Sequence, residues 1–180
     1  MLMDEIRTTV NGHELLFRSP REEDAETLLR YLRAVNGESP YLARDPEDVT
    51  MTAEQERSFL RGMAQSESDM MVMVFCDGEH AGNGSLSGMG LPRCRHRAEL
   101  ALALYKKFSG MGIGTKTMEV LLEQAKSHGW EQLELEVVTD NAPALALYRK
   151  TGFTVCGTLP FAMKYRDGTY AAMYRMLRRI

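Results

Sequence analysis

The stretch from Glu99 to Gly152 has the pattern of a strand, a glycine-rich turn, a helix, a second strand and a second helix, and it constrains the fold more than any other part of the chain. The turn carries Gly110, Gly112 and Gly114. Glycine permits backbone dihedrals that a side chain forbids and lets a ligand approach the main chain closely. The helix that follows presents unpaired N–H groups and the positive end of its dipole. The sequence therefore predicts an anion site, most simply for phosphate; a tight connection without a ligand is the alternative.

Two widespread phosphate-binding loops do not match this turn. A P-loop places lysine directly after its last glycine, but Thr115 separates Gly114 from Lys116. The dinucleotide-binding loop needs a third glycine at a fixed offset and an acidic residue about 20 positions further on. That glycine is missing here, and Glu134 and Glu136 alternate along the next strand. Binding of a nucleotide through its phosphates is therefore a weaker hypothesis.

Length and composition indicate a single domain over residues 1–180, because 180 residues are enough to bury a sizeable core. The chain has 22 Lys and Arg against 25 Asp and Glu, a net charge of −3 that does not favour nucleic acid as a partner. Cys76, Cys94 and Cys156 are an odd number without close spacing, which argues against a disulfide framework. Reduced thiols favour a cytoplasmic protein.

No pattern for a metal site, export or a membrane is found. The four histidines, His13, His80, His96 and His128, have neither a metal-ligand spacing nor neighbouring cysteines, so no metal is expected. The first ten residues, MLMDEIRTTV, carry acidic side chains and no apolar core of a signal peptide. Apolar runs such as MMVMVFC are far shorter than the roughly 20 residues that span a bilayer.

Local signals predict the other elements. Ser19 is expected to cap a first helix, and Thr52 with Gln55 predicts a capping box for a second. Asp77-Gly78 predicts a hairpin turn. The predicted strands cover residues 13–18, 70–75, 80–89, 97–106, 131–138, 153–164 and 170–177, and the later helices cover 112–128 and 141–150. The strand 97–106 alternates leucine and alanine and is expected to be buried on both faces. The order β-α-α-β-β-β-α-β-α-β-β predicts a mixed α/β sheet with helices on both faces.

The organising block resembles the Gcn5-related N-acetyltransferase (GNAT) family. That family has Gln or Arg, two residues, Gly, one residue and then Gly or Ala after a strand, and residues 109–114 match with Ser109 in the first position. Asn141, the run Ala146-Leu147-Tyr148 and Gly152-Phe153 follow at the family's spacing. The second half of the chain matches in motif detail and the first half in element order. The resemblance implies a GNAT-like fold with a central, mostly antiparallel, twisted sheet.

The resemblance also implies acetyl-CoA as the cofactor, with CoA as the product. Amides of the glycine turn would hold its pyrophosphate, and the strand before the turn would pair with its pantetheine arm. Asn141 could contact the pantetheine while it caps its helix. The residues implied are Leu102, Ala103, Leu104, Ser109, Gly110, Met111, Gly112, Ile113, Gly114, Thr115, Asn141 and Tyr148.

Acetyl transfer to an amine needs a base for the amine and an acid for the departing sulfur. Glu136 points away from the leucines of its strand and is the candidate base, acting through a water; Glu134 and Glu99 are rivals, and a solvent-facing glutamate is the alternative. The resemblance implies Tyr148 as the acid, with core packing as the alternative. Cys156 has no histidine nearby in sequence, so direct attack in a ternary complex is favoured over an acyl-enzyme.

These residues predict an N-acetyltransferase acting on a primary amine of a small molecule or of a peptide N-terminus. The loop at residues 36–50 holds Glu38, Asp45, Glu47 and Asp48, which would attract a cationic acceptor or form a solvated acidic loop. A CoA-binding regulatory module without transfer activity is the alternative function. Whether the chain forms a homodimer is left open.

Overall fold

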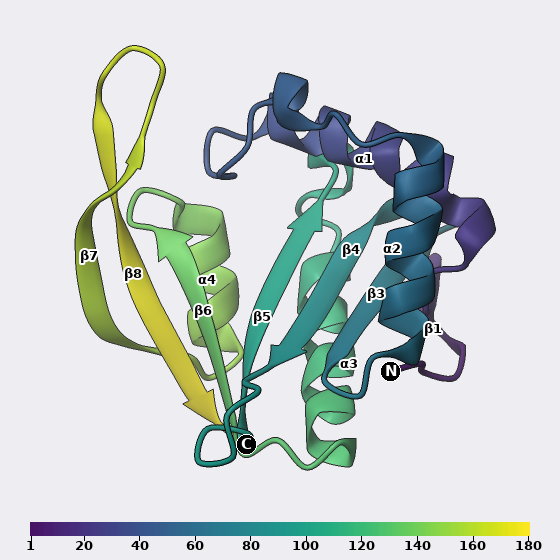
Figure 1. The fold of residues 1–180 in the computed structure, drawn as a ribbon. Helices are drawn as coiled ribbons and strands as arrows, with labels where there is room; N and C mark the ends of the chain where they lie inside the picture. Colours follow the sequence, from purple (N-terminus) through teal and green to yellow (C-terminus); the bar gives the residue numbers. More distant parts are fainter.

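The computed structural model describes residues 1–180 and consists of one eight-stranded sheet with helices on both faces (Figure 1). The strand order is β1-β2-β3-β4-β5-β6-β8-β7, and all neighbours are antiparallel except β5 and β6. The predicted mixed α/β class is therefore confirmed. No helix is both long and apolar enough to cross a bilayer. The strands are β1 (Ile6–Val10), β2 (His13–Arg18), β3 (Asp69–Cys76), β4 (Glu79–Gly88), β5 (Arg97–Leu104), β6 (Gln132–Val138), β7 (Thr154–Lys164) and β8 (Tyr170–Arg179).

Four α-helices cover the sheet unequally. They are α1 (Ala25–Glu38), α2 (Ala53–Gln65), α3 (Ile113–Ser127) and α4 (Ala142–Lys150). The main core of 25 buried residues lies between the sheet and α3 and α4, whereas the core under α1 and α2 has only four. The face under α1 and α2 therefore stays open over β5, where Glu99 and Ala101 are exposed. The expectation that this strand is buried on both faces was wrong, because α1 and α2 do not cover it.

The structure adds one strand, β1, before the first predicted one. β1 pairs with β2 through a turn at Asn11 and Gly12, whose φ angles are +51° and +85°. Asn-Gly is a preferred sequence for a hairpin turn with two positive φ angles, so this signal was available in the sequence. The predicted turn at Asp77 and Gly78 is confirmed, with φ angles of +50° and +82°.

The local sequence signal predicts the start of α2 correctly but not the start of α1. Thr52 and Gln55 form the predicted capping box at α2. Ser19 does not cap a helix, because its hydroxyl accepts a hydrogen bond from the Met3 N–H at 2.9 Å. Instead a short 3-10 turn (Glu22–Asp24) precedes α1, and Asp24 binds the Arg18 guanidinium at 2.7 and 2.8 Å. The Ser19 hydroxyl is thus taken by Met3, 16 residues away, and the helix begins after Asp24 instead.

The two later helices are placed as predicted. Ile113, Thr117 and Leu121 on α3 are buried, and Leu121 packs so closely on β4 that a Cβ at Gly84 would lie 2.7 Å from it. α4 ends in a Schellman motif, in which the Phe153 N–H donates to the Tyr148 carbonyl and the Gly152 N–H to the Arg149 carbonyl. These contacts fix α3 and α4 against one face of the sheet.

The parallel strands β5 and β6 run side by side for only three residues. Arg97, Ala98 and Glu99 pair with Gln132, Leu133 and Glu134, and beyond these the two strands diverge, as Figure 1 shows. The carboxyl-terminal half of β5 therefore has β4 on one edge and no strand on the other. This opening is the main irregularity of the sheet.

Glu134 ties three strands together at the closed end of the opening. Its carboxylate, 5% exposed, accepts hydrogen bonds from Arg97 on β5 at 2.8 Å and from Arg175 on β8 at 2.9 Å. The Gln132 side chain donates to it at 2.8 Å. The hydrogen bonds from Arg97, with those from Gln132 and Arg175, lower the pKa of Glu134 to about 2. The ionised carboxylate is therefore part of the folded state.

We expect Glu134→Gln to lower the free energy of unfolding by about 2 kcal/mol at neutral pH, because two arginines lose their charged partner. The folded-state pKa lies below the ordinary value, so the stabilisation is full above about pH 4.5 and is lost as the pH falls toward about 2. Urea unfolding of the two proteins at several pH values measures this. The difference should shrink on acidification. Glu131→Gln, at an exposed glutamate one residue before β6, is the control and should show no such pH-dependent loss.

Candidate active site

The glycine turn leads into α3 with six consecutive backbone N–H groups that have no acceptor in the protein. The Ser109 N–H bonds to Lys106 and the Lys116 N–H to Gly112, but none of the N–H groups of residues 110–115 donates within the chain. Gly110 and Gly112 adopt φ angles of +79° and +85°, which favour glycine. A row of free donors at a helix N-terminus is a binding site for an anion. The arrangement expected for residues 110–115 is present.

A side chain from the first hairpin supports this turn. The Asn11 side-chain N–H donates to the Met111 carbonyl at 3.0 Å. A Cβ at Gly112 would lie 2.9 Å from Val10 and 3.1 Å from Asn11, so the hairpin packs directly on the turn. With the Met111 carbonyl held by the hairpin, the N–H groups of the turn remain available. Sequence reasoning missed Asn11, although its Asn-Gly turn is a recognisable signal.

The open edge of β5 presents main-chain groups next to the turn. The Tyr105 N–H and the Arg97 carbonyl bond toward β4, at 2.9 and 3.0 Å. Because backbone groups alternate between the two edges of a strand, those of Leu102 and Leu104 point toward the gap beside β6. The Ala103 carbonyl faces the other edge and accepts a hydrogen bond from the buried Tyr31 hydroxyl at 2.8 Å. Leu102 and Leu104 are thus the free backbone partners on this strand.

Tyr148 on α4 is buried, and its hydroxyl makes no hydrogen bond within the protein. Burial raises the pKa of Tyr148 to about 12. The phenol therefore stays protonated at neutral pH and is free to donate to a ligand. Asn141 caps α4, its side-chain oxygen accepting from the Ala144 N–H at 3.2 Å.

The three candidate bases differ sharply in their surroundings. Glu134 is engaged by two arginines and its pKa is lowered to about 2, which makes it a poor base. Glu99 lies in the short segment where β5 and β6 are paired. Glu136 is exposed and has no ion pair. It lies two residues beyond Glu134, the last residue of β6 that pairs with β5, where these two strands begin to diverge. Glu136 is thus the glutamate at the opening.

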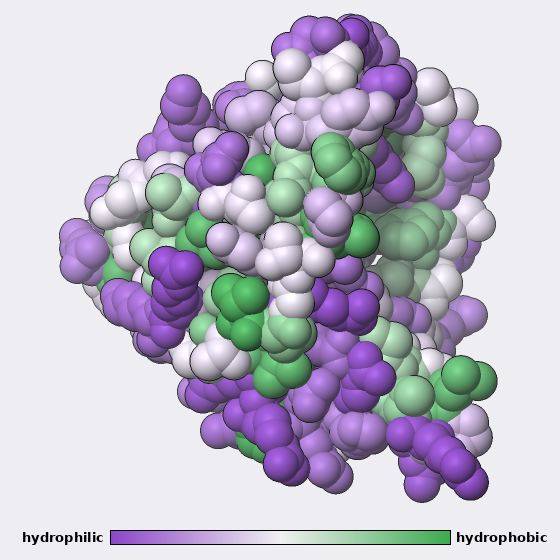
Figure 2. Space-filling view, turned by 90° about the vertical axis from the view of Figure 1, so that its left-hand side faces the viewer, coloured by the Kyte–Doolittle hydropathy of each residue, from purple (hydrophilic) through white to green (hydrophobic).

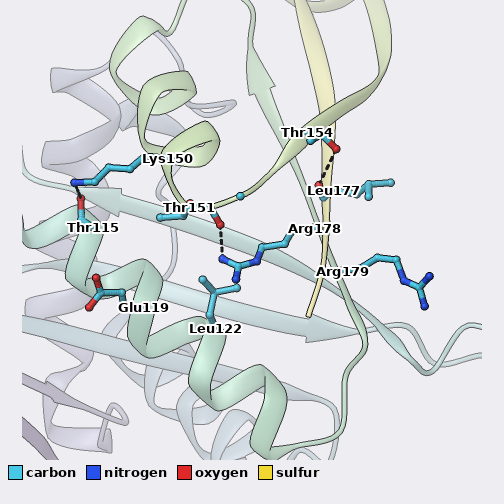
Figure 3. A pocket seen from close by; sticks show the side chains of 10 residues that line it. Thr115, Glu119, Leu122, Lys150, Thr151, Thr154, Leu177, Arg178 and Arg179 are labelled. Carbon is cyan, nitrogen blue, oxygen red and sulfur yellow. Dashed lines mark hydrogen bonds between the residues drawn. The ribbon is translucent and has the colours of Figure 1, made fainter.

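A cavity of 570 Å³ lies beside the glycine turn, between α3, the end of α4 and β8 (Figure 3). The Lys150 ammonium lies 3.4 Å from the Thr115 hydroxyl, and the Arg178 guanidinium donates to the Thr151 carbonyl. Three basic side chains against one acidic side chain make it attractive to anions. The residues that line it are Thr115, Glu119, Leu122, Lys150, Thr151, Gly152, Thr154, Leu177, Arg178 and Arg179. Sequence spacing gave no signal for it, because the basic residues come from distant elements.

The acidic loop at residues 36–50 does not present free carboxylates. Asp45 and Glu47 bind Arg166 of the β7–β8 turn at 2.7 and 3.0 Å. Asp48 accepts the Asp45 N–H at 2.8 Å, and Glu38 accepts the Lys106 N–H at 2.7 Å. These contacts hold the loop in place, and a role of its carboxylates in attracting a cationic acceptor stays a prediction.

Comparison with known proteins identifies what this geometry resembles. A family model described as "Acetyltransferase (GNAT) domain" matches residues 14–154. The L-amino acid N-acetyltransferase AaaT of Escherichia coli (strain K12) is 31% identical over 112 residues, which cover 59% of this chain and 66% of that protein, just under two thirds. A GNAT-family acetyltransferase from Streptococcus pneumoniae has a TM-score of 0.87 at 28% identity, covering 92% of this chain and 99% of that one. The yncA protein of Salmonella typhimurium, solved with acetyl-CoA, shares the fold with a TM-score of 0.79 at 16% identity, covering 92% and 93%.

We expect Asn11→Gly to raise the dissociation constant for coenzyme A, the ligand that the sequence motifs imply, by about three- to tenfold, the loss expected for one hydrogen bond. Glycine keeps the positive φ of the turn and removes only the amide that binds Met111. Isothermal titration calorimetry measures the affinity. Asp167→Gly, in the turn of the distant β7–β8 hairpin, is the control. Unchanged affinity in Asn11→Gly would show that the hydrogen bond does not support the turn.

Proposed function

Because this chain belongs to the GNAT acetyltransferase family, we propose that it is an acetyl-CoA-dependent N-acetyltransferase acting on a primary amine of a small molecule or of a peptide N-terminus. The observation that carries the proposal is the row of unpaired N–H groups at residues 110–115, beside the gap between β5 and β6. These donors fit a pyrophosphate, and the open strand edge fits an amide-containing arm. A relative solved with acetyl-CoA supports the same cofactor.

The proposed contacts with the cofactor follow from the free groups. The amides of residues 110–115 bind the pyrophosphate, with Ser109 at the entrance of the turn. The main chain of Leu102 and Leu104 pairs with the pantetheine arm, and Ala103 lies between them with its carbonyl held by Tyr31. Asn141, at the start of α4, is a further proposed contact with the pantetheine arm. The basic cavity near Lys150 takes the phosphate at the nucleotide end of the cofactor.

The chemistry is divided between the cofactor and two side chains. Acetyl-CoA supplies the acetyl group as a reactive thioester. Glu136 accepts the proton of the acceptor amine through a water, which its exposure at the gap favours over Glu134 and Glu99. Tyr148 donates the proton that the leaving sulfur needs, and its raised pKa keeps that proton in place. A free N–H on the open edge of β5 can stabilise negative charge that develops on the thioester oxygen.

The acceptor and the location of the protein belong to the same proposal. A relative named as an L-amino acid N-acetyltransferase supports a small amine. The three cysteines are free, which is in keeping with a cytoplasmic protein.

The direct test is release of free thiol from acetyl-CoA in the presence of a panel of amines that includes amino acids, polyamines and peptide N-termini. We expect turnover with at least one of these amines, and acetylated amine equal to the thiol released. Tight binding of CoA without turnover on any amine contradicts the transferase and indicates a binding module.

Tyr148→Phe and Glu136→Gln are expected to lower kcat by about 10²-fold each, the loss typical of a proton-transfer group. Neither variant should change CoA affinity or thermal stability much, because the Tyr148 hydroxyl and the Glu136 carboxylate have no partner in the protein. Since the pKa of Tyr148 is raised to about 12, Tyr148→Phe should lower kcat evenly between about pH 6 and 10. Steady-state kinetics over this pH range measures kcat of the two variants. Glu99→Gln is the matched control and should keep the wild-type kcat. Wild-type turnover in either variant removes that residue from the mechanism.

A second copy of this chain is the protein partner that the surface favours. β7 is an edge strand, and residues 154–161 are all exposed. Its apolar side chains Val155, Leu159 and Phe161 are 43, 54 and 75% exposed. Figure 2, a view onto this side of the molecule, shows green apolar groups among purple and white ones. Such an edge pairs readily with another chain.

We expect the protein to dimerise and Phe161→Asp to raise the dimer dissociation constant at least about tenfold, as loss of one well-buried interface anchor does. Sedimentation velocity over a concentration series measures this. Phe59→Asp, at an exposed phenylalanine of α2, is the control and should remain dimeric. A wild-type monomer at every concentration contradicts the proposal.

A further inference from the structure

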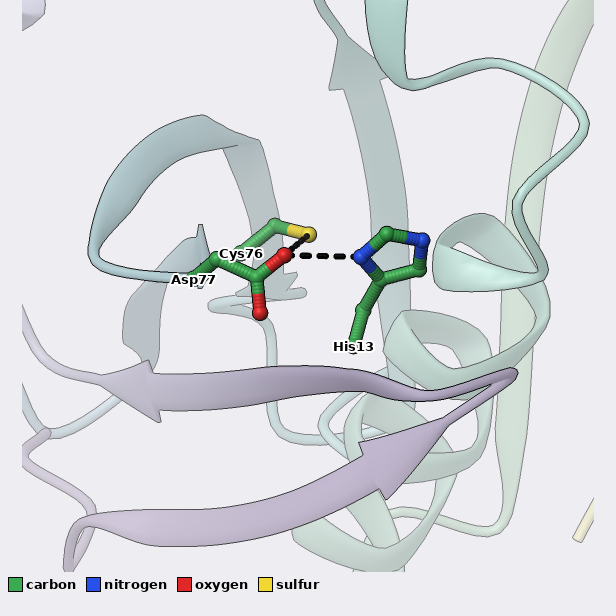
Figure 4. A group of neighbouring side chains, drawn as sticks. All are labelled: His13, Cys76 and Asp77. Carbon is green, nitrogen blue, oxygen red and sulfur yellow. Dashed lines mark hydrogen bonds and ion pairs between the residues drawn. The ribbon is translucent and has the colours of Figure 1, made fainter.

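Three side chains outside the acetyl-transfer site meet where the first two hairpins touch. His13 begins β2, Cys76 ends β3, and Asp77 forms the turn that leads to β4. Their imidazole nitrogen, thiol sulfur and carboxylate oxygen all lie within 4.8 Å of one another. Figure 4 shows Cys76 and Asp77 side by side and facing the His13 ring, with dashed lines from one Asp77 oxygen to both partners. Scattered histidines had predicted no metal site, but folding brings one of them beside a cysteine 63 residues away in sequence.

The Asp77 carboxylate is the neighbour that the other two donors share. One Asp77 oxygen lies 2.7 Å from His13 Nδ1 and 3.8 Å from Cys76 Sγ. The other Asp77 oxygen accepts the Glu14 N–H at 2.9 Å, and the Asp77 N–H donates to the Glu14 carbonyl at 2.8 Å. The carboxylate is thus oriented by β2 before any ion binds, as outer contacts orient metal ligands.

The position leaves room for an ion and for water. Cys76 is 2% exposed, whereas the side chains of His13 and Asp77 are 38 and 54% exposed. Metal–ligand bonds of about 2.0–2.3 Å would require the His13 nitrogen and the Asp77 oxygen to separate to about 3.3 Å. That pair must open by roughly half an ångström, and the His13 nitrogen and Cys76 sulfur, which lie within 4.8 Å, must come to about 3.6 Å. The partly exposed imidazole ring can make both movements. The solvent side leaves the fourth position of a tetrahedron to water.

We propose that His13, Cys76 and Asp77 form a binding site for a divalent transition-metal ion, with zinc as the fitting ion and water as the fourth ligand. One nitrogen, one sulfur and one oxygen donor suit zinc and exclude magnesium and calcium, which take oxygen ligands. Binding forms a metal–sulfur bond, and the thiol proton passes to solvent. The histidine binds through its unprotonated Nδ1, and the aspartate as its carboxylate.

The bound ion joins the start of β2 to the end of β3, and β2 belongs to the hairpin that supports the glycine turn. His13 lies two residues after Asn11, which holds the Met111 carbonyl. The site thus lies on the hairpin that borders the proposed cofactor site, but none of its ligands is among the residues assigned to the cofactor. Failure of the metal proposal therefore leaves the acetyl-transfer proposal untouched, and the reverse is also true.

Cobalt(II) is the probe, because a thiolate ligand gives it a near-ultraviolet charge-transfer band and tetrahedral geometry gives it strong visible bands. The full-length protein is stripped with a chelator, and cobalt chloride is titrated in; zinc chloride should then displace the cobalt. We expect one cobalt per chain with both sets of bands. Cys76→Ser should abolish the near-ultraviolet band, and Cys156→Ser, at an exposed thiol elsewhere, should keep it.

His13→Gln gives a second reading if Cys76→Ser fails to fold, because His13 is partly exposed and lies at a strand end. It should weaken cobalt binding at least about tenfold, since loss of even an outer-shell partner costs that much. Absence of a thiolate band in the wild-type protein overturns the proposal. A band that persists in Cys76→Ser, or unchanged affinity in His13→Gln, also overturns it.

Discussion

The ion pairs of Glu134 are the constraint on which the rest of the structure depends. Arg97 on β5 and Arg175 on β8 both bind this one carboxylate on β6, so three strands are fixed at a single point. The two parallel strands pair for three residues beside that point and can separate only beyond it. A sheet that is closed at one end and open at the other gives an elongated ligand access to main-chain groups. The charge cluster thus fixes the end of the sheet from which the opening between β5 and β6 begins.

The site consists largely of donors that folding has left without partners. Residues 110–115 keep six N–H groups free, and the hydroxyl of the largely buried Tyr148 side chain has no hydrogen-bond partner in the protein. Free donors in a folded protein cost stability unless a ligand or water satisfies them. The surrounding contacts hold them in place, because Asn11 binds the turn and the Schellman motif fixes the end of α4. These donors are arranged before the ligand arrives, so little reorganisation is needed on binding.

Charge is distributed so that the two sides of the opening differ. The carboxylates of residues 36–50 bind Arg166 and backbone N–H groups, and they connect α1 and its following loop to the 3-10 turn after β5 and to the β7–β8 turn. The basic groups near Lys150 and Arg178 line the cavity next to the glycine turn. The basic lining of this cavity therefore attracts anions. Such a lining suits the phosphates of the coenzyme A that we propose as the ligand.

The sequence by itself determined the elements whose stabilising bonds are local. The capping box at Thr52, the Asp77-Gly78 turn and the stop at Gly152 each close hydrogen bonds within about six residues, so their residue types predict them. The glycine turn was predicted from the spacing of its glycines. The fold class was predicted from the order of the elements and from the resemblance to the family. Tertiary structure alone decided that Ser19 binds Met3 instead of capping the first helix, that Glu134 is held by two arginines while Glu136 is free, and that Asn11 supports the turn. It also decided that His13 meets Cys76. These contacts join residues that lie far apart in sequence or depend on what packs around them, and no periodicity in the chain specifies which distant side chain will arrive.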